Sequence, residues 1–190
     1  SKYVAQQIER FEAGGALVRI DLSTRALGAA APIGSNVRHV TVAADGRTVY
    51  ASRFVTPPLP GEGTATVQTS VDGAPVGGEV VVVDASTMIV QRTITLAHSN
   101  DVDAETQGRG IPNYVGALAV SPDGTQGFVP SKKDNILRGS LRDGRPLDFQ
   151  NTVRAISSRI DLATQQEDLS ARVDHDNASM ASAAAFDQLG

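Results

Sequence analysis

The residues best suited to bind a metal ion or to move a proton are two histidines with acidic neighbours. His98 is followed by Asp101, and His175 lies between Asp174 and Asp176. Imidazole and carboxylate groups ligate metal ions, and imidazole also titrates near neutral pH. Because no fixed ligand spacing joins the two histidines, hydrogen bonding to loop backbone is the simpler interpretation. Both histidines therefore stay weak metal candidates.

A second candidate is a run of alternating carboxylates, as found in calcium-binding loops. Asp101, Asp103 and Glu105 supply these carboxylates. Counted from Asp101, an EF-hand loop needs glycine at its sixth position and glutamate at its twelfth, where this chain has Thr106 and Pro112. We therefore interpret the run as a solvated acidic loop, with an irregular oxygen-ligand site as the alternative.

Basic side chains gather in one segment, residues 132–154. A purely basic patch would indicate an anionic ligand, but acidic residues alternate with the basic ones here. The mixture predicts a solvated loop with weak ion pairs. Arg154 is the exception, because it begins an apolar run and is expected to be partly buried with a carboxylate partner. The basic residues are Lys132, Lys133, Arg138, Arg142, Arg145 and Arg154, and the interleaved acids are Asp134, Asp143 and Asp148.

Several other chemistries lack the residues that they require. The 190 residues include no cysteine, which excludes disulfides, thiolate metal sites, haem attachment and a cysteine nucleophile in this chain. Neither a Gly-x-Ser-x-Gly motif nor a phosphate-binding Gly-x-x-x-x-Gly-Lys-Ser/Thr loop occurs. The net charge of −4 argues against a nucleic-acid partner. The sequence predicts no cofactor in this chain and no membrane-spanning helix, since no apolar run approaches the ~20 residues required.

The strands that must position these residues recur along the chain. One pattern is a β-prone run that ends in Asp, with Thr three residues later, and it occurs at residues 17–24, 80–87 and 158–164. Asp and Thr side chains cap tight turns, and a further β-prone run follows at residues 89–96 after the second copy and, more weakly, at residues 169–173 after the third. Each copy therefore predicts a hairpin.

A second pattern alternates with the first. Residues 40–51 and 118–129 each have the form strand, Asp-Gly turn, strand, since Gly supplies the positive φ of a tight turn. Residues 183–190 are interpreted as the first strand of another such hairpin. Residues 2–6 are interpreted as a second strand, with a short helix over residues 1–11 as the alternative.

Two hairpins make one repeat unit, whose strands we label A to D. The chain then runs BCD, ABCD, ABCD, A, which gives about three units. Four antiparallel strands per unit, with small residues in the first strand, predict an all-β β-propeller, and residues 1–190 are interpreted as a single partial propeller domain. Because propellers close with about 4–8 blades, we expect a longer protein or self-association through open blade edges. Two copies would supply about six blades.

The two turn motifs resemble those of the YVTN-type bacterial β-propeller repeat family. The best-matching segments are Val120-Ser121-Pro122-Asp123-Gly124 and Val82-Val83-Asp84-Ala85-Ser86-Thr87. Residues 110–114, 130–136, 142–144 and 152–156 resemble propellers that precede a cytochrome-c-peroxidase-like di-haem domain in exported bacterial proteins. The resemblance implies a periplasmic or extracellular location. It carries no haem chemistry to this chain, which has no Cys-x-x-Cys-His motif.

Strand direction divides the connections between two ends of the units. The A–B and C–D turns are short, whereas the B–C and D–A connections contain every long insertion: residues 55–78, 97–114 and 132–154. Long loops on a rigid scaffold usually carry binding groups, although these loops could also cover exposed edges. The candidate ligand-binding residues at this end are His98, Asp101, Asp103, Arg109, Asn113, Lys132, Lys133, Arg154, His175 and Asp176.

Two functions of different classes follow from these residues. The leading hypothesis is a non-catalytic binding or scaffolding module of an exported bacterial protein, which holds a protein partner, a neighbouring domain or a cell-surface component with the long loops. The alternative is a metal-dependent lyase or hydrolase that uses His98 and His175 at the propeller axis. A purely structural role in a cell-surface layer is a third option.

Overall fold

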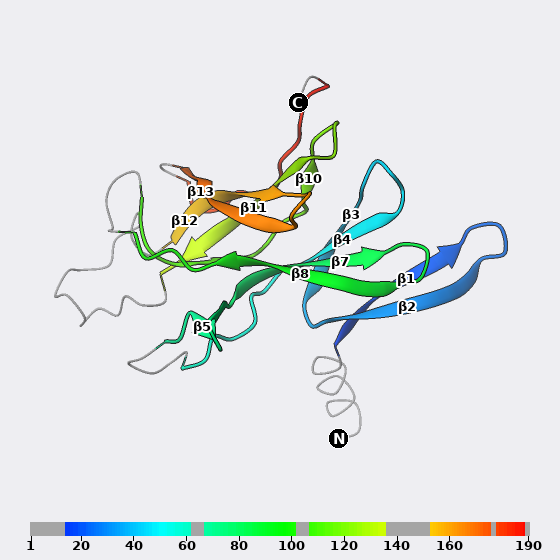
Figure 1. The fold of residues 1–190 in the computed structure, drawn as a ribbon, viewed down its shortest axis with the longest axis horizontal. Coiled ribbons are helices and arrows are strands. Elements are labelled where there is room, and N and C mark those ends of the chain that lie inside the picture. Colours follow the sequence, from blue (N-terminus) through cyan, green and yellow to red (C-terminus); the bar gives the residue numbers. More distant parts are fainter. Residues whose placement is uncertain (1–13, 62–66, 102–106, 136–152, 176–177, 189–190) are drawn as a thin grey trace.

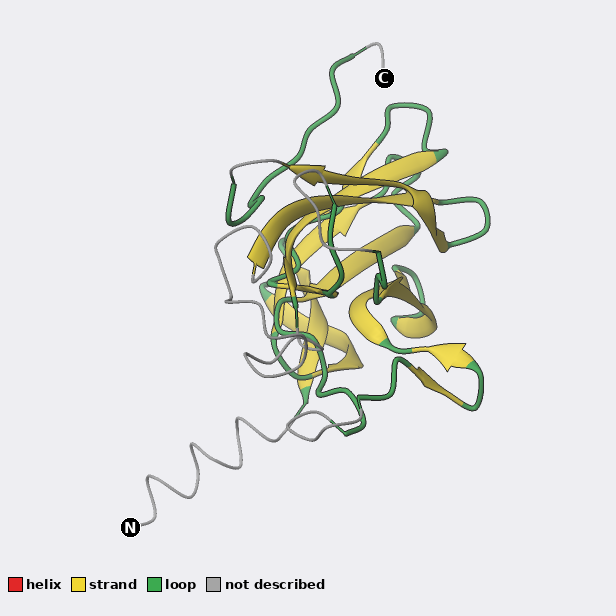
Figure 2. Cartoon of the chain, turned by 90° about the vertical axis from the view of Figure 1, so that its left-hand side faces the viewer, coloured by secondary structure: helices red, strands yellow, loops and turns green. Residues whose placement is uncertain are grey.

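The computed structural model describes residues 14–61, 67–101, 107–135, 153–175 and 178–188. Regular structure in these ranges is entirely β-strand (Figure 2), and they contain no apolar helix of the length that crosses a bilayer. The strands are β1 (Gly15–Asp21), β2 (Ala26–Gly34), β3 (Val37–Val42), β4 (Thr48–Arg53), β5 (Ser70–Val71), β6 (Ala74–Pro75), β7 (Gly77–Asp84), β8 (Ile89–Ala97), β9 (Ile111–Asn113), β10 (Ala119–Val120), β11 (Gln126–Asp134), β12 (Val153–Asp161) and β13 (Gln166–His175).

These strands pair in the predicted order of four. One sheet has the order β3-β4-β7-β8, and we call it the β3–β8 sheet. A second has the order β10-β11-β12-β13, with β9 beside β11, and we call it the β10–β13 sheet. Strands β1 and β2 form a two-stranded sheet, and β5 and β6 form a small hairpin. Every pairing is antiparallel. The all-β prediction is therefore confirmed. The two four-stranded sheets are strands A–D of two successive units, and β1 and β2 are strands C and D of the unit before them.

The two ends of the predicted repeat are less regular. The strand predicted at residues 2–6, and the alternative helix over residues 1–11, lie outside the described residues. The strand predicted at 183–190 is wrong for the described part, since residues 178–188 contain no strand. Isolated backbone bonds hold this segment instead of a ladder: Ala155 N–H to Ala178 O (3.0 Å) and Ala181 N–H to Ser131 O (3.3 Å).

The three C–D hairpins share one turn geometry, which the Asp-x-x-Thr motif sets. In the first two turns the Asp carboxylate accepts a hydrogen bond from the serine hydroxyl, at 2.6 Å from Ser23 and from Ser86, and further bonds from backbone N–H groups of the turn. These bonds lower the pKa of Asp21 and of Asp84 to about 2. The residue after the threonine is left-handed in each turn: φ is 57° at Arg25, 57° at Met88 and 53° at Gln165. A shared left-handed position closes a tight hairpin without glycine.

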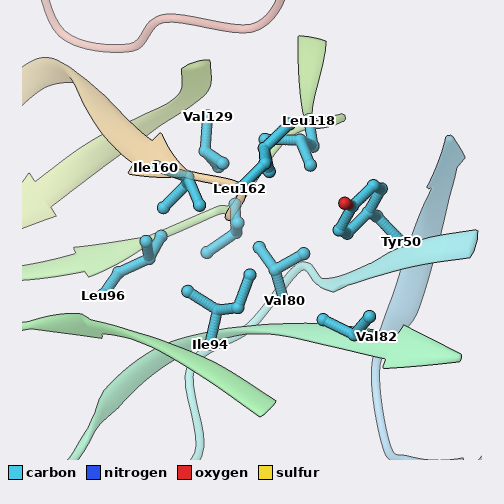
Figure 3. Close-up of a cluster of buried hydrophobic side chains, with 10 residues drawn as sticks. Tyr50, Val80, Val82, Ile94, Leu96, Leu118, Val129, Ile160 and Leu162 are labelled. Atoms are coloured by element: carbon cyan, nitrogen blue, oxygen red, sulfur yellow. The ribbon is translucent and has the colours of Figure 1, made fainter. Parts of the chain in front are cut away.

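The sheets stack face to face through two apolar layers. Val81 and Val83 of β7 pack with Ala31 and Ile33 of β2, while Val80 and Val82 point the other way. The second layer joins the β3–β8 sheet to the β10–β13 sheet (Figure 3), and its members are Tyr50, Val80, Val82, Ile94, Leu96, Val115, Leu118, Val129, Ile160 and Leu162. Figure 1 shows the resulting order, from β1–β2 through β3–β8 to β10–β13.

Corresponding strands of neighbouring sheets lie next to one another. At the A strands, Thr41 Oγ1 donates to Leu118 O at 2.8 Å. At the D strands, β8 contacts both β13 and β2, and Arg92 Nη1 donates to Thr164 O at 3.2 Å. The sheets are therefore successive units fanned in one direction, as a propeller requires.

Short turns lie at one end of the strands and long connections at the other. The turn end carries the Asp-Gly and Asp-x-x-Thr turns, and the loop end carries the connections from β4 to β7, β8 to β9 and β11 to β12. The Ser35-Asn36 turn between β2 and β3 is the short exception at the loop end. Strands enter the predicted loops: β5 and β6 lie within 55–78, β9 lies within 97–114, and β11 extends to Asp134.

The layer between the two four-stranded sheets is expected to dominate stability. Leu96→Ala removes a side chain that is fully buried in this layer, and it should lower the free energy of unfolding by about 2–5 kcal/mol. Ile89→Ala, on the same strand but 62% exposed, should change it by less than about 0.5 kcal/mol. Urea denaturation followed by circular dichroism measures both, and equal losses would contradict the assigned register.

Candidate functional site

The predicted ligand-binding residues gather at the loop end. Lys132, Lys133 and Arg154 lie in β11 and β12, so they belong to strands rather than to the insertion in which the sequence placed them. Asp103 and Asp176 lie outside the described residues. The register of β11 and β12 pairs Lys133 directly with Arg154, and both side chains are buried.

A buried ion pair occupies the space between the two four-stranded sheets at this end. Lys133 is 2% exposed, and its Nζ donates to Asp174 Oδ2 at 2.7 Å and to Oδ1 at 3.0 Å. Burial lowers the pKa of Lys133, while the Asp174 carboxylate opposes that shift. Lys133 faces the seam because it alternates with Val129 and Ser131 along β11. The pair is therefore part of the contact between sheets.

A second charged pair clamps the end of β8. Arg172 Nη2 donates to Ala97 O at 2.7 Å, and Ala97 N–H donates to Glu167 Oε2 at 2.7 Å. Arg172 Nε in turn donates to Glu167 Oε1 at 3.0 Å. The pairing of β12 with β13 has a bulge between Ser157 and Arg159. At this bulge β13 has two more extra residues than β8 has at the corresponding point of its pairing with β7, and the bulge directs Arg172 toward this backbone.

His98 lies directly after this clamp, and it is buried among cations. It is 7% exposed, and neither ring nitrogen has a hydrogen-bond partner within the described residues. Burial lowers the pKa of His98 to about 4, with further lowering by Arg172, Lys133 and Arg109. The imidazole is therefore neutral at pH 7. The hydroxyls of Ser131 and Ser158 are also buried without a partner in the described residues.

The structure does not bring the two histidines together. The β13 register pairs His175 with Ala155, and the β8 register pairs Leu96 with Gly78, so His175 corresponds to Leu96 rather than to His98. His175 also lies on the sheet face opposite to its neighbour Asp174, which faces the seam. The two histidines are therefore not equivalent positions of the repeat, because the register irregularity in β13 offsets them by two residues.

His175 instead hydrogen-bonds a serine on the outer face of the β10–β13 sheet. The distance from Ser157 Oγ to His175 Nε2 is 2.9 Å. A serine–histidine pair is the first requirement for a nucleophilic hydroxyl, but the base must also be oriented by a third group. Within the described residues no carboxylate bonds to His175, and no cluster of three or more His, Cys, Asp or Glu residues could hold a metal ion.

The sequence missed an aromatic stack that joins the sheets near their A strands. Phe54 and Tyr114 stack with ring centroids 4.7 Å apart and an interplanar angle of 9°. The Arg38 guanidinium lies 3.8 Å from the Phe54 centroid, and the Lys132 ammonium lies 4.0 Å from the Tyr114 centroid. We call these four residues the cation–aromatic stack. Its members come from separate segments, so no local pattern could have revealed it.

Asn113 fixes the position of this stack. Its Oδ1 accepts from Thr56 N–H at 3.0 Å and from Tyr114 N–H at 2.9 Å, and its Nδ2 donates to Asp134 Oδ2 at 2.8 Å. Tyr114 has a φ of 51° and is 38% exposed. A left-handed backbone is costly for an aromatic residue, and such strain concentrates where a side chain must be presented in one orientation.

The remaining predicted residues line the connection from β8 to β9. Ser99 and Gly110 form an isolated antiparallel bridge, which closes this connection at its base. Asp101 Oδ2 accepts from Ser99 Oγ at 2.5 Å, and Arg109 precedes the bridge. The loop is thus anchored beside His98, so the candidate site is a rigid seam flanked by long connections.

Comparison with solved structures identifies the architecture. The chain matches Kuenenia stuttgartiensis hydrazine synthase, a β-propeller-containing protein, with a TM-score of 0.53 and 12% sequence identity. The fold is that of a β-propeller. The match covers 79% of this chain and 33% of the hydrazine synthase chain, so the chain spans about a third of the length of that protein. At this identity the likeness shows the fold alone.

A second match is a propeller-containing enzyme, the acylaminoacyl peptidase of Pyrococcus horikoshii. Its TM-score is 0.39 at 11% identity, over 85% of this chain and 23% of that one. No protein-family profile matches the propeller chain, and no curated protein does.

Acid should destabilise the propeller module through His98. Its folded pKa of about 4 lies below the usual value of ~6.5, so the unfolded chain takes up the proton first as the pH falls. Stability contributed by the neutral imidazole is fully present above pH ~6.5 and is lost between that pH and 4, by up to about 3 kcal/mol. Urea midpoints at pH 7 and pH 4.5 should differ less in His98→Gln than in the wild type. His175→Gln is the matched control and should keep the wild-type difference.

The buried ion pair should be costly to break from one side. Asp174→Ala leaves the Lys133 ammonium buried without its carboxylate, and it should lower the free energy of unfolding by about 3–5 kcal/mol. Asp168→Ala tests an exposed pair, with Arg159 Nη1 3.8 Å from Asp168 Oδ2, and should cost far less. Thermal unfolding at pH 7 compares the two. Equal losses would show that burial does not set the cost.

Proposed function

We propose that this chain is a non-catalytic binding module of an exported bacterial β-propeller protein, and that its loop end holds a protein partner or a neighbouring domain. The observation that supports this most directly is the cation–aromatic stack. Tyr114 and Arg38 are exposed at the loop end, and the stack and Asn113 fix the Tyr114 ring in a strained backbone conformation. Aromatic and arginine side chains held in this way are the usual anchors of protein interfaces.

The surroundings of the stack also favour a protein partner over a small molecule. Phe54 and Tyr114 cover each other, and Arg38 and Lys132 cover their outer faces, so no ring face is open to a planar ligand. The exposed Tyr114 and Arg38 side chains are left to contact a protein surface. The long connections emerge beside this surface and can extend the contact area. The proposal of an exported location rests on the resemblance of the turn motifs to the YVTN-type family.

Substitutions in the stack should separate partner binding from folding. Tyr114→Ala and Arg38→Ala should each reduce recovery of the partner at least about tenfold in affinity capture from the source organism. Arg47→Ala, at an exposed position of the turn end, is the control and should not reduce it. Circular dichroism confirms that each variant is folded. Undiminished recovery with both stack variants would reject this surface as the binding site.

A further inference from the structure

Two copies of one tetrapeptide have opposite environments in this chain. Arg19-Ile20-Asp21-Leu22 and Arg159-Ile160-Asp161-Leu162 are identical and occupy the same place in the C–D hairpin. Ile160 is 0% exposed and Leu162 is 8% exposed, whereas Ile20 is 54% exposed and Leu22 is 87% exposed. The same side chains are buried in one unit and open in another.

The difference follows from the direction in which the units stack. The residue before the turn Asp packs on the preceding sheet: Val83 contacts the β1–β2 sheet, and Ile160 contacts the β3–β8 sheet. Ile20 is the corresponding residue of β1, and no described sheet precedes it. Val18 and Leu27 share this exposure, and Leu27 pairs directly with Ile20. We call Val18, Ile20, Leu22 and Leu27 the open face of β1–β2.

The β10–β13 sheet, at the other end of the series of sheets, exposes the complementary surface. Phe128 corresponds to Tyr50 of the preceding unit, and Val173 to Ile94, and both Tyr50 and Ile94 are buried against the following sheet. Val173 is 46% exposed, and Phe128 is half-buried, with the Phe186 ring of its own chain 5.8 Å away between centroids. Together with Arg159 these two residues form the open face of β10–β13.

An arginine shows how the two open faces fit. Arg19 reaches across the interface inside the chain, and its Nη1 donates to Ser86 O at 3.2 Å and to Ala85 O at 3.4 Å in the next C–D turn. Arg159 is the same residue of the repeat, its side chain is 42% exposed, and its Nη1 lies 3.8 Å from Asp168 Oδ2 in its own sheet. The carbonyls that correspond to Ala85 and Ser86 in the first unit are those of Leu22 and Ser23.

We propose that a second copy of this chain packs its open β1–β2 face on the open β10–β13 face, head to tail. Ile20 and Leu22 of one copy cover Phe128 and Val173 of the other, and Arg159 donates to the backbone carbonyls of the partner's C–D turn. Two such contacts, related by a twofold axis, close a ring and leave neither open face in water. Closure of the ring buries the same kind of apolar surface that a complete propeller buries between its blades.

The mass in solution tests this arrangement. The wild-type chain should sediment as a dimer, at twice its mass of 19.8 kDa. Leu22→Glu and Arg159→Glu should each raise the dimer dissociation constant at least about 30-fold, and neither should unfold the chain, because both side chains are exposed in the single copy. Ile89→Glu is the matched control on an exposed strand away from both faces, and it should stay dimeric. A wild-type monomer at about 100 μM, or an open assembly larger than a dimer, would overturn the proposal.

Cross-linking distinguishes head-to-tail contact from other dimers. The chain has no cysteine, so single Leu22→Cys and Arg159→Cys variants each carry one reactive thiol. A short bismaleimide should link the mixture of the two variants and leave each variant alone unlinked. Linkage of Leu22→Cys with itself would show a head-to-head dimer and overturn the proposal. This assembly does not depend on the loop-end partner, so either proposal can fail alone.

Discussion

Strands β4 and β7, at the centre of the β3–β8 sheet, are buried on both faces, and the rest of the structure depends on that packing. Successive valines of β7 point alternately to the β1–β2 sheet and to the β10–β13 sheet, and all four are at most 3% exposed. A strand buried on both sides needs apolar residues at consecutive positions, which explains the run Val80-Val81-Val82-Val83. The core is therefore a set of layers between sheets, built from β-branched and aliphatic side chains instead of large aromatics.

At the loop end the seam between the same sheets becomes polar. Lys133, Asp174, Arg172 and Glu167 form ion pairs where valine and leucine pack farther along the strands. Buried ion pairs seldom add net stability compared with apolar packing, but they require one geometry. The position of the β8 end, and of His98 after it, is thus fixed by directional contacts. That rigidity supports the long connections that begin there.

Turn chemistry explains why the two ends of the strands differ. Every Asp-Gly and Asp-x-x-Thr turn is satisfied locally by its own carboxylate, so the turn end needs no long connection. The long connections at the loop end are not closed by a carboxylate of their own turn. Their backbone groups bond instead to the neighbouring unit, as Thr56 does to Asn113. Contacts between units therefore occur at both ends: Arg19 and Arg92 bond to the neighbouring C–D turns at the turn end, and the cation–aromatic stack lies at the loop end.

The sequence alone determined the repeat, the strand order and the end at which the long connections lie, because alternation and turn motifs are local signals. Tertiary structure decided which residues meet at that end. Tyr114 meets Phe54 and Arg38 only because two sheets stack, and a two-residue register irregularity in β13 separates the roles of His98 and His175. Identical residues at 20 and 160 differ in burial for the same reason: what covers a strand face is decided by the neighbouring sheet, which the strand's own residues do not encode.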